Sequence, residues 1–412
     1  MMIRRFAAAM LCAVVLNSCA NDDSTGPLPA QNVGWERTNF VGAFLPPDAS
    51  TGFVAIATFG GGVSAIDAAT GATRWSLQLP APPSQSYFAR WVSPRDIIAF
   101  NPFPDASLGL TLIDGVSGTV RRSGSSLIQP LAILNSWAIA SAADTALLGL
   151  TSLADSVIWR RTYPRISCGR ASTCRLFDPI GVIGNTLYIK QSVVTGQASA
   201  RVDSLLRIEA TGQTSARVLP FVSEPLTRGS EPRVSSAESL YWMASATSVY
   251  GVNVFDGTIR WRVLTPALFP PRNGVAIDFL HADEDSSERT LRVAFYLQDT
   301  VKNARSIEGV VLRMSDGSVV RRITLDATKR AQLAYVGPCG SDGVAFVNSE
   351  GTIDYARWSG APATHWRSSK LNDAMPPYLQ QNILPYFYSA GTTTLLVELG
   401  LTNTLLGLNC AH

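Results

Sequence analysis

The chain has 412 residues, a formal net charge of +3, 46% hydrophobic residues and only 16% charged residues. So small a charge on so long a chain creates no broad basic field, which excludes a general nucleic-acid-binding protein. The high hydrophobic content instead indicates strands that are covered on both faces.

The first residues have the features of an export signal. Arg4 and Arg5 give a positive start, residues 6–16 form an apolar run, and Leu16-Asn17-Ser18-Cys19 follows at the distance of a cleavage site. This segment resembles the lipobox of bacterial lipoproteins, and the resemblance implies that Cys19 is the lipid anchor. A plain secretory signal is the alternative. A membrane-spanning helix is disfavoured, because it needs about twenty apolar residues.

We therefore divide the chain into three parts. Residues 1–18 are predicted to be a lipoprotein signal peptide, 19–32 the lipid anchor with a flexible tether, and 33–412 a folded domain. The expected location is the cell envelope. Ala20, directly after the anchor, resembles the pattern of lipoproteins sent to the outer membrane, where the domain would face the periplasm or the cell surface.

The folded domain begins with a single predicted strand at 33–40, which has no partner before it. The most regular stretch follows at residues 60–79, where two strands of alternating apolar residues flank a turn at Thr70-Gly71 and the second strand carries Trp75. Such a hairpin cannot bury its faces alone, so neighbouring copies are expected to stack on it.

Weaker copies of this hairpin continue to the end of the chain. After a strand at 52–59 and the first hairpin, the strands predicted in chain order are 96–100, 108–114, 136–141, 146–153, 157–161, 186–191, 204–210, 239–244, 249–255, 258–263, 291–297, 309–314, 318–325, 343–348, 352–358, 385–389, 393–399 and 404–409. Turn positions recur at 71, 118, 155, 212, 257, 317 and 360, a step of about 48 residues.

This spacing predicts the fold class. A four-stranded propeller blade with its loops needs roughly 40 to 50 residues. The eighth copy lacks an outer strand, which residues 33–40 can supply. We therefore expect an all-β, eight-bladed β-propeller of four-stranded antiparallel blades, closed by an N-terminal strand in the last blade. A seven-bladed ring is the alternative.

One string carries a family resemblance. GGGVSAIDAATGATRW at residues 60–75 is similar to the repeat of pyrroloquinoline-quinone-like β-propellers, G-x-V-x-A-hydrophobic-D-x-x-T-G-x-x-x-W. Later copies keep fragments of it. A lipid-anchored member with no added domain resembles the outer-membrane assembly lipoproteins of this family. That resemblance implies a protein-binding scaffold with an envelope protein as its partner.

The residues at repeat positions are predicted to hold blades together rather than to form a site. Stacking platforms for a quinone or a sugar are the alternative interpretation of the tryptophans. The predicted packing residues are Asp67, Gly71, Trp75, Trp159, Gly212, Gly257, Trp261, Gly317, Gly360 and Trp366.

Cysteine usage agrees with export. Beyond the signal and the anchor, Cys168, Cys174, Cys339 and Cys410 remain, an even number in an oxidising compartment. Four cysteines allow three pairings. Cys168 with Cys174 would close a short loop, and Cys339 with Cys410 a long one. Zinc binding is disfavoured by the spacing.

Two charged features could do more. Arginines follow the turns on the predicted outer strands, where they discourage pairing with other chains; a surface for anionic head groups or acidic partners is the alternative. Asp283, Glu284 and Asp285 stand beside His281, but without a calcium-loop spacing, so we expect a solvated loop.

No enzyme signature is present: the sequence contains no G-x-S-x-G, H-E-x-x-H or Walker A string. We therefore expect a non-enzymatic scaffold without catalytic residues, a metal or a cofactor. A quinone- or small-ligand-binding propeller enzyme, and a surface binding module for polysaccharide or peptide, are the alternatives.

Overall fold

The protein consists of β-strands joined by turns and loops, with one short 3-10 helix, η2 (Thr265–Leu268), in the part of the chain that the structure describes. Within that part, no helix is long and apolar enough to cross a membrane. The structure is a computed structural model, and it describes residues 34–38, 40–44, 52–81, 87–91, 96–100, 110–124, 128–134, 137–142, 146–150, 157–163, 175–195, 200–218, 233–235, 237–270, 274–302, 304–326, 335–339, 342–347, 352–360, 364–367, 386–390, 394–399 and 403–409.

The described strands form eight antiparallel sheets of four strands each. Sheet 1 comprises β2 (Phe40–Phe44), β3 (Phe53–Thr58), β4 (Gly62–Asp67) and β5 (Thr73–Gln78). Sheet 2 comprises β6 (Phe88–Trp91), β7 (Asp96–Phe100), β8 (Leu110–Asp114) and β9 (Val120–Gly124). Sheet 3 comprises β10 (Ile128–Leu134), β11 (Trp137–Ala142), β12 (Ala146–Leu150) and β13 (Val157–Thr162). Sheet 4 comprises β14 (Arg175–Ile183), β15 (Thr186–Thr195), β16 (Ala200–Glu209) and β17 (Thr214–Val218).

The second half of the chain repeats this order. Sheet 5 comprises β18 (Arg233–Ser235), β19 (Leu240–Ala244), β20 (Ser248–Asn253) and β21 (Ile259–Leu264). Sheet 6 comprises β22 (Val275–Asp285), β23 (Thr290–Asp299), β24 (Ala304–Arg313) and β25 (Val319–Asp326). Sheet 7 comprises β26 (Tyr335–Cys339), β27 (Gly343–Val347), β28 (Thr352–Arg357) and β29 (Thr364–Arg367). Sheet 8 comprises β30 (Tyr386–Ala390), β31 (Thr394–Leu399), β32 (Thr404–Asn409) and β1 (Trp35–Arg37).

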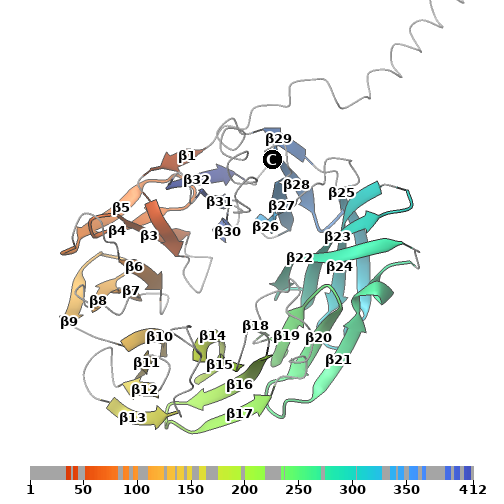
Figure 1. Ribbon diagram of the computed structural model, residues 1–412. Helices are drawn as coiled ribbons and strands as arrows, with labels where there is room; N and C mark the ends of the chain where they lie inside the picture. Colours follow the sequence, from red (N-terminus) through yellow and green to blue (C-terminus); the bar gives the residue numbers. More distant parts are fainter. Residues whose placement is uncertain are drawn as a thin grey trace, which may run out of the picture.

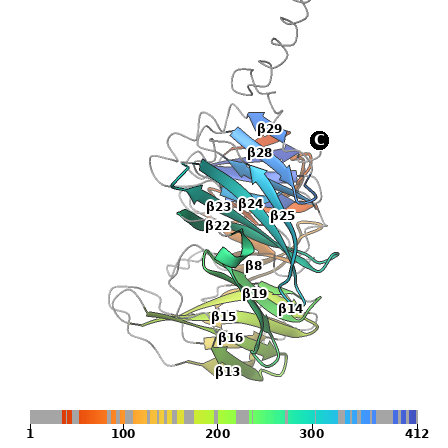
Figure 2. The same cartoon turned by 90° about the vertical axis from the view of Figure 1, so that its right-hand side faces the viewer.

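The sheets follow one another in chain order around a common centre (Figure 1). The first strand of each sheet in this order lies nearest the centre, and the fourth lies at the periphery. In the side view, the long strands β15 and β16 of sheet 4 and β22 and β23 of sheet 6 extend beyond the other strands (Figure 2).

The first and last described strands meet in sheet 8. β1 pairs antiparallel with β32, with Trp35 opposite Gly407 and Arg37 opposite Leu405. The strand predicted at 33–40 is therefore shorter than expected, because Phe40 already begins β2, the inner strand of sheet 1. Within a few residues the chain thus passes from β1, which pairs with β32 in sheet 8, to β2, which pairs with β3 in sheet 1.

Apolar side chains fill the space between neighbouring sheets. Between sheets 5 and 6, for example, Leu240 and Trp242 are fully buried with Val293, Phe295 and Leu312. Burying each such side chain contributes about 1.5–3 kcal/mol. Because each sheet covers the next, the strands read as apolar on both faces, in agreement with the low charge content.

Candidate functional site

Four tryptophans of the outer strands join neighbouring sheets. Each indole Nε1 donates a hydrogen bond to a backbone carbonyl in the turn between the third and fourth strands of the next sheet. We call each such contact a seam. The donor–acceptor pairs are Trp35 to Ala68 (2.8 Å), Trp75 to Gly115 (2.9 Å), Trp159 to Ala210 (3.1 Å) and Trp261 to Met314 (2.7 Å).

The turn glycines make room for these indoles. Gly71 and Gly317 both have φ near +70°, which only glycine adopts without strain. A Cβ on Gly71 would lie 2.4 Å from Trp35 Cγ, and one on Gly317 would lie 2.7 Å from Trp261 Cε3. Gly118 faces Trp75 and Gly212 faces Trp159 in the same way. The turn glycines are thus needed for both backbone conformation and space.

A second glycine lies under the indole within its own sheet. Gly149 pairs with Trp159, and an added Cβ would lie 2.2 Å from the indole. Gly251 and Gly407 stand in the same relation to Trp261 and Trp35, and Ala65 pairs with Trp75.

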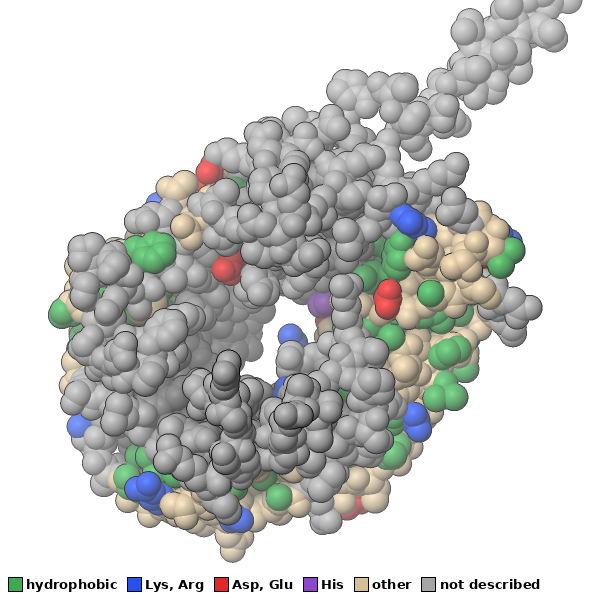
Figure 3. Space-filling view, in the orientation of Figure 1, with side chains coloured by type: hydrophobic (Ala, Val, Ile, Leu, Met, Phe, Trp, Pro, Cys, Tyr) green, Lys and Arg blue, Asp and Glu red, His purple; other side chains and the backbone are tan. Residues whose placement is uncertain are grey.

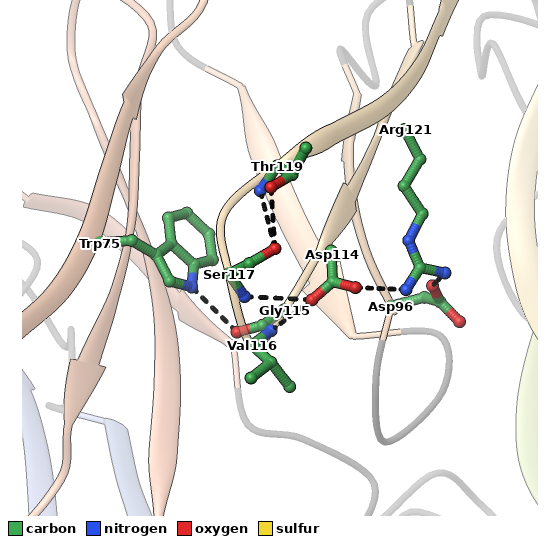
Figure 4. A network of polar contacts seen from close by, with 8 residues as sticks. All are labelled: Trp75, Asp96, Asp114, Gly115, Val116, Ser117, Thr119 and Arg121. Carbon is green, nitrogen blue, oxygen red and sulfur yellow. Dashed lines mark hydrogen bonds and ion pairs between the residues drawn. The ribbon is translucent and has the colours of Figure 1, made fainter.

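Figure 4 shows the seam between sheets 1 and 2. Asp114 Oδ1 accepts hydrogen bonds from the backbone N–H groups of Val116 (2.9 Å) and Ser117 (3.0 Å), and its other oxygen pairs with Arg121. Burial alone would raise the pKa of Asp114, but these hydrogen bonds and the guanidinium hold it well below its usual range. The carboxylate thus fixes the turn that receives Trp75.

Asp67 plays the same part in sheet 1. Its Oδ1 accepts hydrogen bonds from Thr70 N (2.9 Å), Thr70 Oγ1 (2.9 Å) and Ala69 N (3.1 Å). Burial opposes ionisation, but these bonds and nearby Arg74 lower the pKa of Asp67. The turn ends at Gly71, against which Trp35 of sheet 8 packs. Asp67, Thr70 and Gly71 therefore shape the turn against which an indole of the neighbouring sheet packs.

Trp35 is the seam residue that the sequence reasoning missed. The signal that could have found it is the small residue opposite each seam tryptophan, because Gly407 of the last strand pairs with Trp35 as Gly251 pairs with Trp261.

The structure corrects the equivalence assigned to Trp366. In sheet 5, Trp261 pairs two residues before the end of the third strand. The residue at that register in sheet 7 is Thr364, which pairs with Tyr355, whereas Trp366 pairs with Ile353. Trp366 therefore lies two residues further along its strand. The described pairing of β28 with β29 has no bulge, whereas the pairing of β20 with β21 has one between Gly251 and Val252.

At the seam between sheets 6 and 7, the tryptophan lies in the turn and an arginine lies on the outer strand. Arg321 occupies the tryptophan position of sheet 6, opposite Val311, and donates to the Trp358 carbonyl at 2.9 Å. The missing indole volume is supplied from sheet 7, where Trp358 stands in the turn and packs onto Gly309 and Leu325. Its Nε1 is buried and has no hydrogen-bond partner among the described residues.

The remaining repeat glycines also have positive φ. Gly257 (φ +71°) donates its N–H to the Asn253 carbonyl at 2.9 Å. Gly360 (φ +87°) follows Trp358, and an added Cβ there meets no described atom within 4 Å. Both glycines therefore serve the turn conformation, and at Gly360 no indole packs against the turn.

A second polar cluster lies on the inner strand of sheet 6. Asp283, Glu284 and Asp285 belong to β22 itself, so the solvated loop expected there is wrong. Asp283 pairs across the ladder with Arg292, its Oδ2 lies 3.8 Å from Arg292 NH1, and its Oδ1 lies 3.5 Å from His281 Nε2. The acidic run stays in a strand because this nearly buried arginine balances its charge.

The neighbouring residues Asp285 and Glu284 also make polar contacts. Asp285 pairs with Arg292 and accepts hydrogen bonds from Ser287. Burial would raise the pKa of Asp285, but these contacts lower it. Glu284 points to the other face and accepts from Ser235 Oγ at 2.7 Å and Trp242 Nε1 at 3.4 Å, both of sheet 5. No group of described His, Cys, Asp and Glu side chains is arranged to hold a metal ion.

Arginine dominates the periphery. The eight outer strands contain twelve arginines, no lysine and two acidic residues. Figure 3 shows basic side chains at the rim and beside the central opening, where a histidine also lies. Most outer arginines with described side chains contact their own fold. Arg121 lies 2.8 Å from Asp96, Arg322 Nε lies 2.5 Å from the Leu268 carbonyl, and Arg74 lies over the Phe53 ring.

The predicted cysteine sites fall mainly outside the described residues. Cys19, Cys168, Cys174 and Cys410 are among the residues not described. Cys339 is the last residue of β26, where the backbone pairs with Gly343 and the side chain is not described. The anchor and both disulfides stay predictions.

Comparisons with known proteins bear on the fold. No protein-family model and no curated protein matches the chain. Among solved structures, BamB from Moraxella catarrhalis is 12% identical over 92% of this chain and 99% of its own, with a TM-score of 0.51. The C-terminal WD40 domain of Sif2 is 10% identical over 94% and 100%, with a TM-score of 0.55. Sqt1 from Saccharomyces cerevisiae is 9% identical over 92% and 98%, with a TM-score of 0.53.

The chain has a β-propeller-type fold. At these identities the likeness concerns the fold alone, because one propeller architecture carries many unrelated functions. The narrower resemblance to pyrroloquinoline-quinone-like repeats rests on the sequence string at residues 60–75.

Proposed function

We propose that the protein is a non-enzymatic cell-envelope lipoprotein whose propeller is a protein-binding scaffold of the outer-membrane assembly kind. The observation that carries the proposal is the likeness to BamB over 92% of this chain and 99% of the other. In this proposal the eight sheets are the blades of one ring, and β1 supplies the outer strand of the last blade.

The described residues suit a scaffold. Several polar groups at the seams and on β22 are used in contacts between or within sheets, as Trp75, Asp114 and Glu284 illustrate. Cys19 would hold the ring at the membrane through the tether, facing the periplasm or the cell surface. The partner is an envelope protein, and its docking requires neither cofactor nor metal.

Site-specific photocrosslinking in native membranes tests the scaffold role. A photoreactive residue replaces Val116 or Phe255, both exposed on the face of the seam turns, or Val301, exposed at the hairpin tips of the opposite face. We expect a discrete adduct with one envelope protein from one face. Recovery of no envelope protein from any position would overturn the scaffold role.

The anchor has its own test. Replacing Cys19 with alanine should abolish incorporation of labelled palmitate and release the protein from the membrane fraction. Continued labelling of the variant would contradict the assignment of Cys19. The alternative functions predict other results: quinone absorbance in the purified protein for the enzyme, and retention of a soluble polysaccharide for the surface module.

A further inference from the structure

The outer strand of sheet 3 differs from its counterparts in how its arginines are engaged. In β13, every side chain except Trp159 is exposed. Val157 and Ile158 are 55% and 50% exposed and are followed, after Trp159, by Arg160 and Arg161. An edge strand also presents a row of unpaired backbone N–H and C=O groups. β13 therefore combines open backbone, apolar surface and positive charge.

The arginines of other outer strands whose side chains the structure describes are engaged within the fold. Arg121 binds Asp96 and Asp114, Arg260 lies 3.5 Å from Glu238, and Arg321 and Arg322 donate to backbone carbonyls. These contacts explain their presence without a partner.

Arg160 and Arg161 have no such contacts. Arg160 makes no hydrogen bond or ion pair in the part of the chain that the structure describes, and Arg161 is only 6.0 Å from the Tyr163 ring centroid. Exposed aliphatic residues also lie beside the arginines of β21, at Ile259 and Leu264, but Arg260 there lies near Glu238. On β13 both the aliphatic side chains and the charges are open to a partner.

We propose that β13 is a docking edge that takes an extended, acidic segment of a partner protein as a fifth strand of sheet 3. Backbone hydrogen bonds would give affinity, and alternate side chains would give specificity. This inference rests on the proposed scaffold role for its biological setting. A second copy of this chain is the less favourable occupant, because it would bring four arginines together with no counter-charge.

The register of β13 defines the chemistry of the segment. Antiparallel pairing places acidic residues opposite Arg161 and Arg160, a small residue opposite Trp159 and aliphatic residues opposite Ile158 and Val157. We choose a small residue there by analogy with Gly149 of β12, which pairs with Trp159 on the inner side. The partner segment therefore reads acid-acid-small-aliphatic-aliphatic from its N-terminus.

The test uses the purified full chain and a fluorescent peptide with the core Asp-Glu-Gly-Val-Ile, followed by anisotropy. We expect saturable binding, weakened about tenfold or more by the double substitution R160E/R161E. The matched control is Arg262→Glu on β21, at the position equivalent to Arg160, which should leave binding unchanged. A peptide with Lys-Lys in place of Asp-Glu should bind R160E/R161E, which also shows that this variant is folded.

Backbone pairing is tested with peptides N-methylated on alternate residues. An added strand uses only one of the two alternating sets of N–H groups, so one methylated peptide should lose binding and the other should keep it. Equal binding of both would overturn strand addition. Binding of the chain to phosphatidylglycerol vesicles that R160E/R161E abolishes, without any peptide binding, would assign the edge to a membrane surface instead.

The two failures are distinguishable. Peptide titration does not depend on the native envelope, so its failure leaves a crosslinked partner standing. Failure of the crosslinking leaves a measured peptide edge without a scaffold role.

Discussion

The seams on the two sides of sheet 6 solve one packing problem in opposite directions. Between sheets 5 and 6, Trp261 reaches forward from an outer strand, fills the space over Gly317 and donates to the Met314 carbonyl. Between sheets 6 and 7, Arg321 donates to the equivalent carbonyl, and Trp358 reaches back from the turn to fill the space.

The two seams show that one residue or two can meet the same pair of packing requirements. A seam needs a donor for the turn carbonyl and an aromatic volume between the sheets. Trp261 supplies both, whereas Arg321 and Trp358 supply one each. The divided solution leaves the Trp358 Nε1 buried without a described partner, and such a group costs about 1–3 kcal/mol.

The largest expected effect is the loss of a seam indole. Trp261→Ala removes a buried aromatic side chain and leaves the Met314 carbonyl unpaired, so we expect a loss of about 3–5 kcal/mol. Chemical denaturation of the purified protein, followed by intrinsic fluorescence, measures it. A loss below about 1 kcal/mol would show that the seams do not hold the sheets together.

The turn glycines should report which way a seam is built. Gly317→Ala suffers both a strained φ and a clash with Trp261, whereas Gly360→Ala suffers only the strained φ, which costs about 1–3 kcal/mol. We therefore expect a clearly larger fall in melting temperature for Gly317→Ala than for its matched control Gly360→Ala. Equal falls would contradict the packing difference.

Acid should weaken the turn of sheet 2, which the Asp114 carboxylate holds in place. At neutral pH Asp114→Asn loses the Arg121 pair, at a cost of about 1–2 kcal/mol. Because the folded-state pKa of Asp114 is depressed, its stabilisation is present above about pH 3.8 and disappears as the pH falls toward the folded value.

The difference between wild type and Asp114→Asn in denaturation midpoint should therefore shrink below about pH 3.8. A constant difference across this pH range would refute the role assigned to the Asp114 carboxylate.

The smallest effect isolates one hydrogen bond. Trp261→Phe and Trp358→Phe remove similar volumes, but only the first leaves a carbonyl without its donor. We expect Trp261→Phe to be the more destabilising by about 1 kcal/mol, from paired denaturation curves. The opposite order would mean that Trp358 Nε1 has a partner.

Local signals made much of the fold predictable. The hairpins of sheets 1, 5 and 6 follow from Gly71, Gly257 and Gly317 with alternating apolar residues on either side, because turn chemistry and strand periodicity are short-range properties. The inner strands β6, β10, β14, β18, β22 and β26 were missed. They lie outside the hairpin between the third and fourth strands of each sheet, whose turn signal was used to find the copies.

The seams were partly predictable. The sequence indicated that Trp75, Trp159 and Trp261 occupy one repeated position, but it did not show which turn receives each indole, since that depends on the order of sheets in space. The reversed pair Arg321 and Trp358 breaks the repeat at both positions. Only the three-dimensional contact reveals that one substitution compensates for the other.

The pairing of β1 with β32 has a consequence for how the chain matures. The first described strand finds its neighbour only among the last residues, and Trp35 then packs against the turn at Gly71. Contacts between such distant segments form late and slowly. A chain whose synthesis stopped before β32 would leave the edge of β31 unpaired and the Trp35 side chain without its place in sheet 8. Proteases could then attack both segments. Completion of the last sheet thus distinguishes finished molecules from unfinished ones.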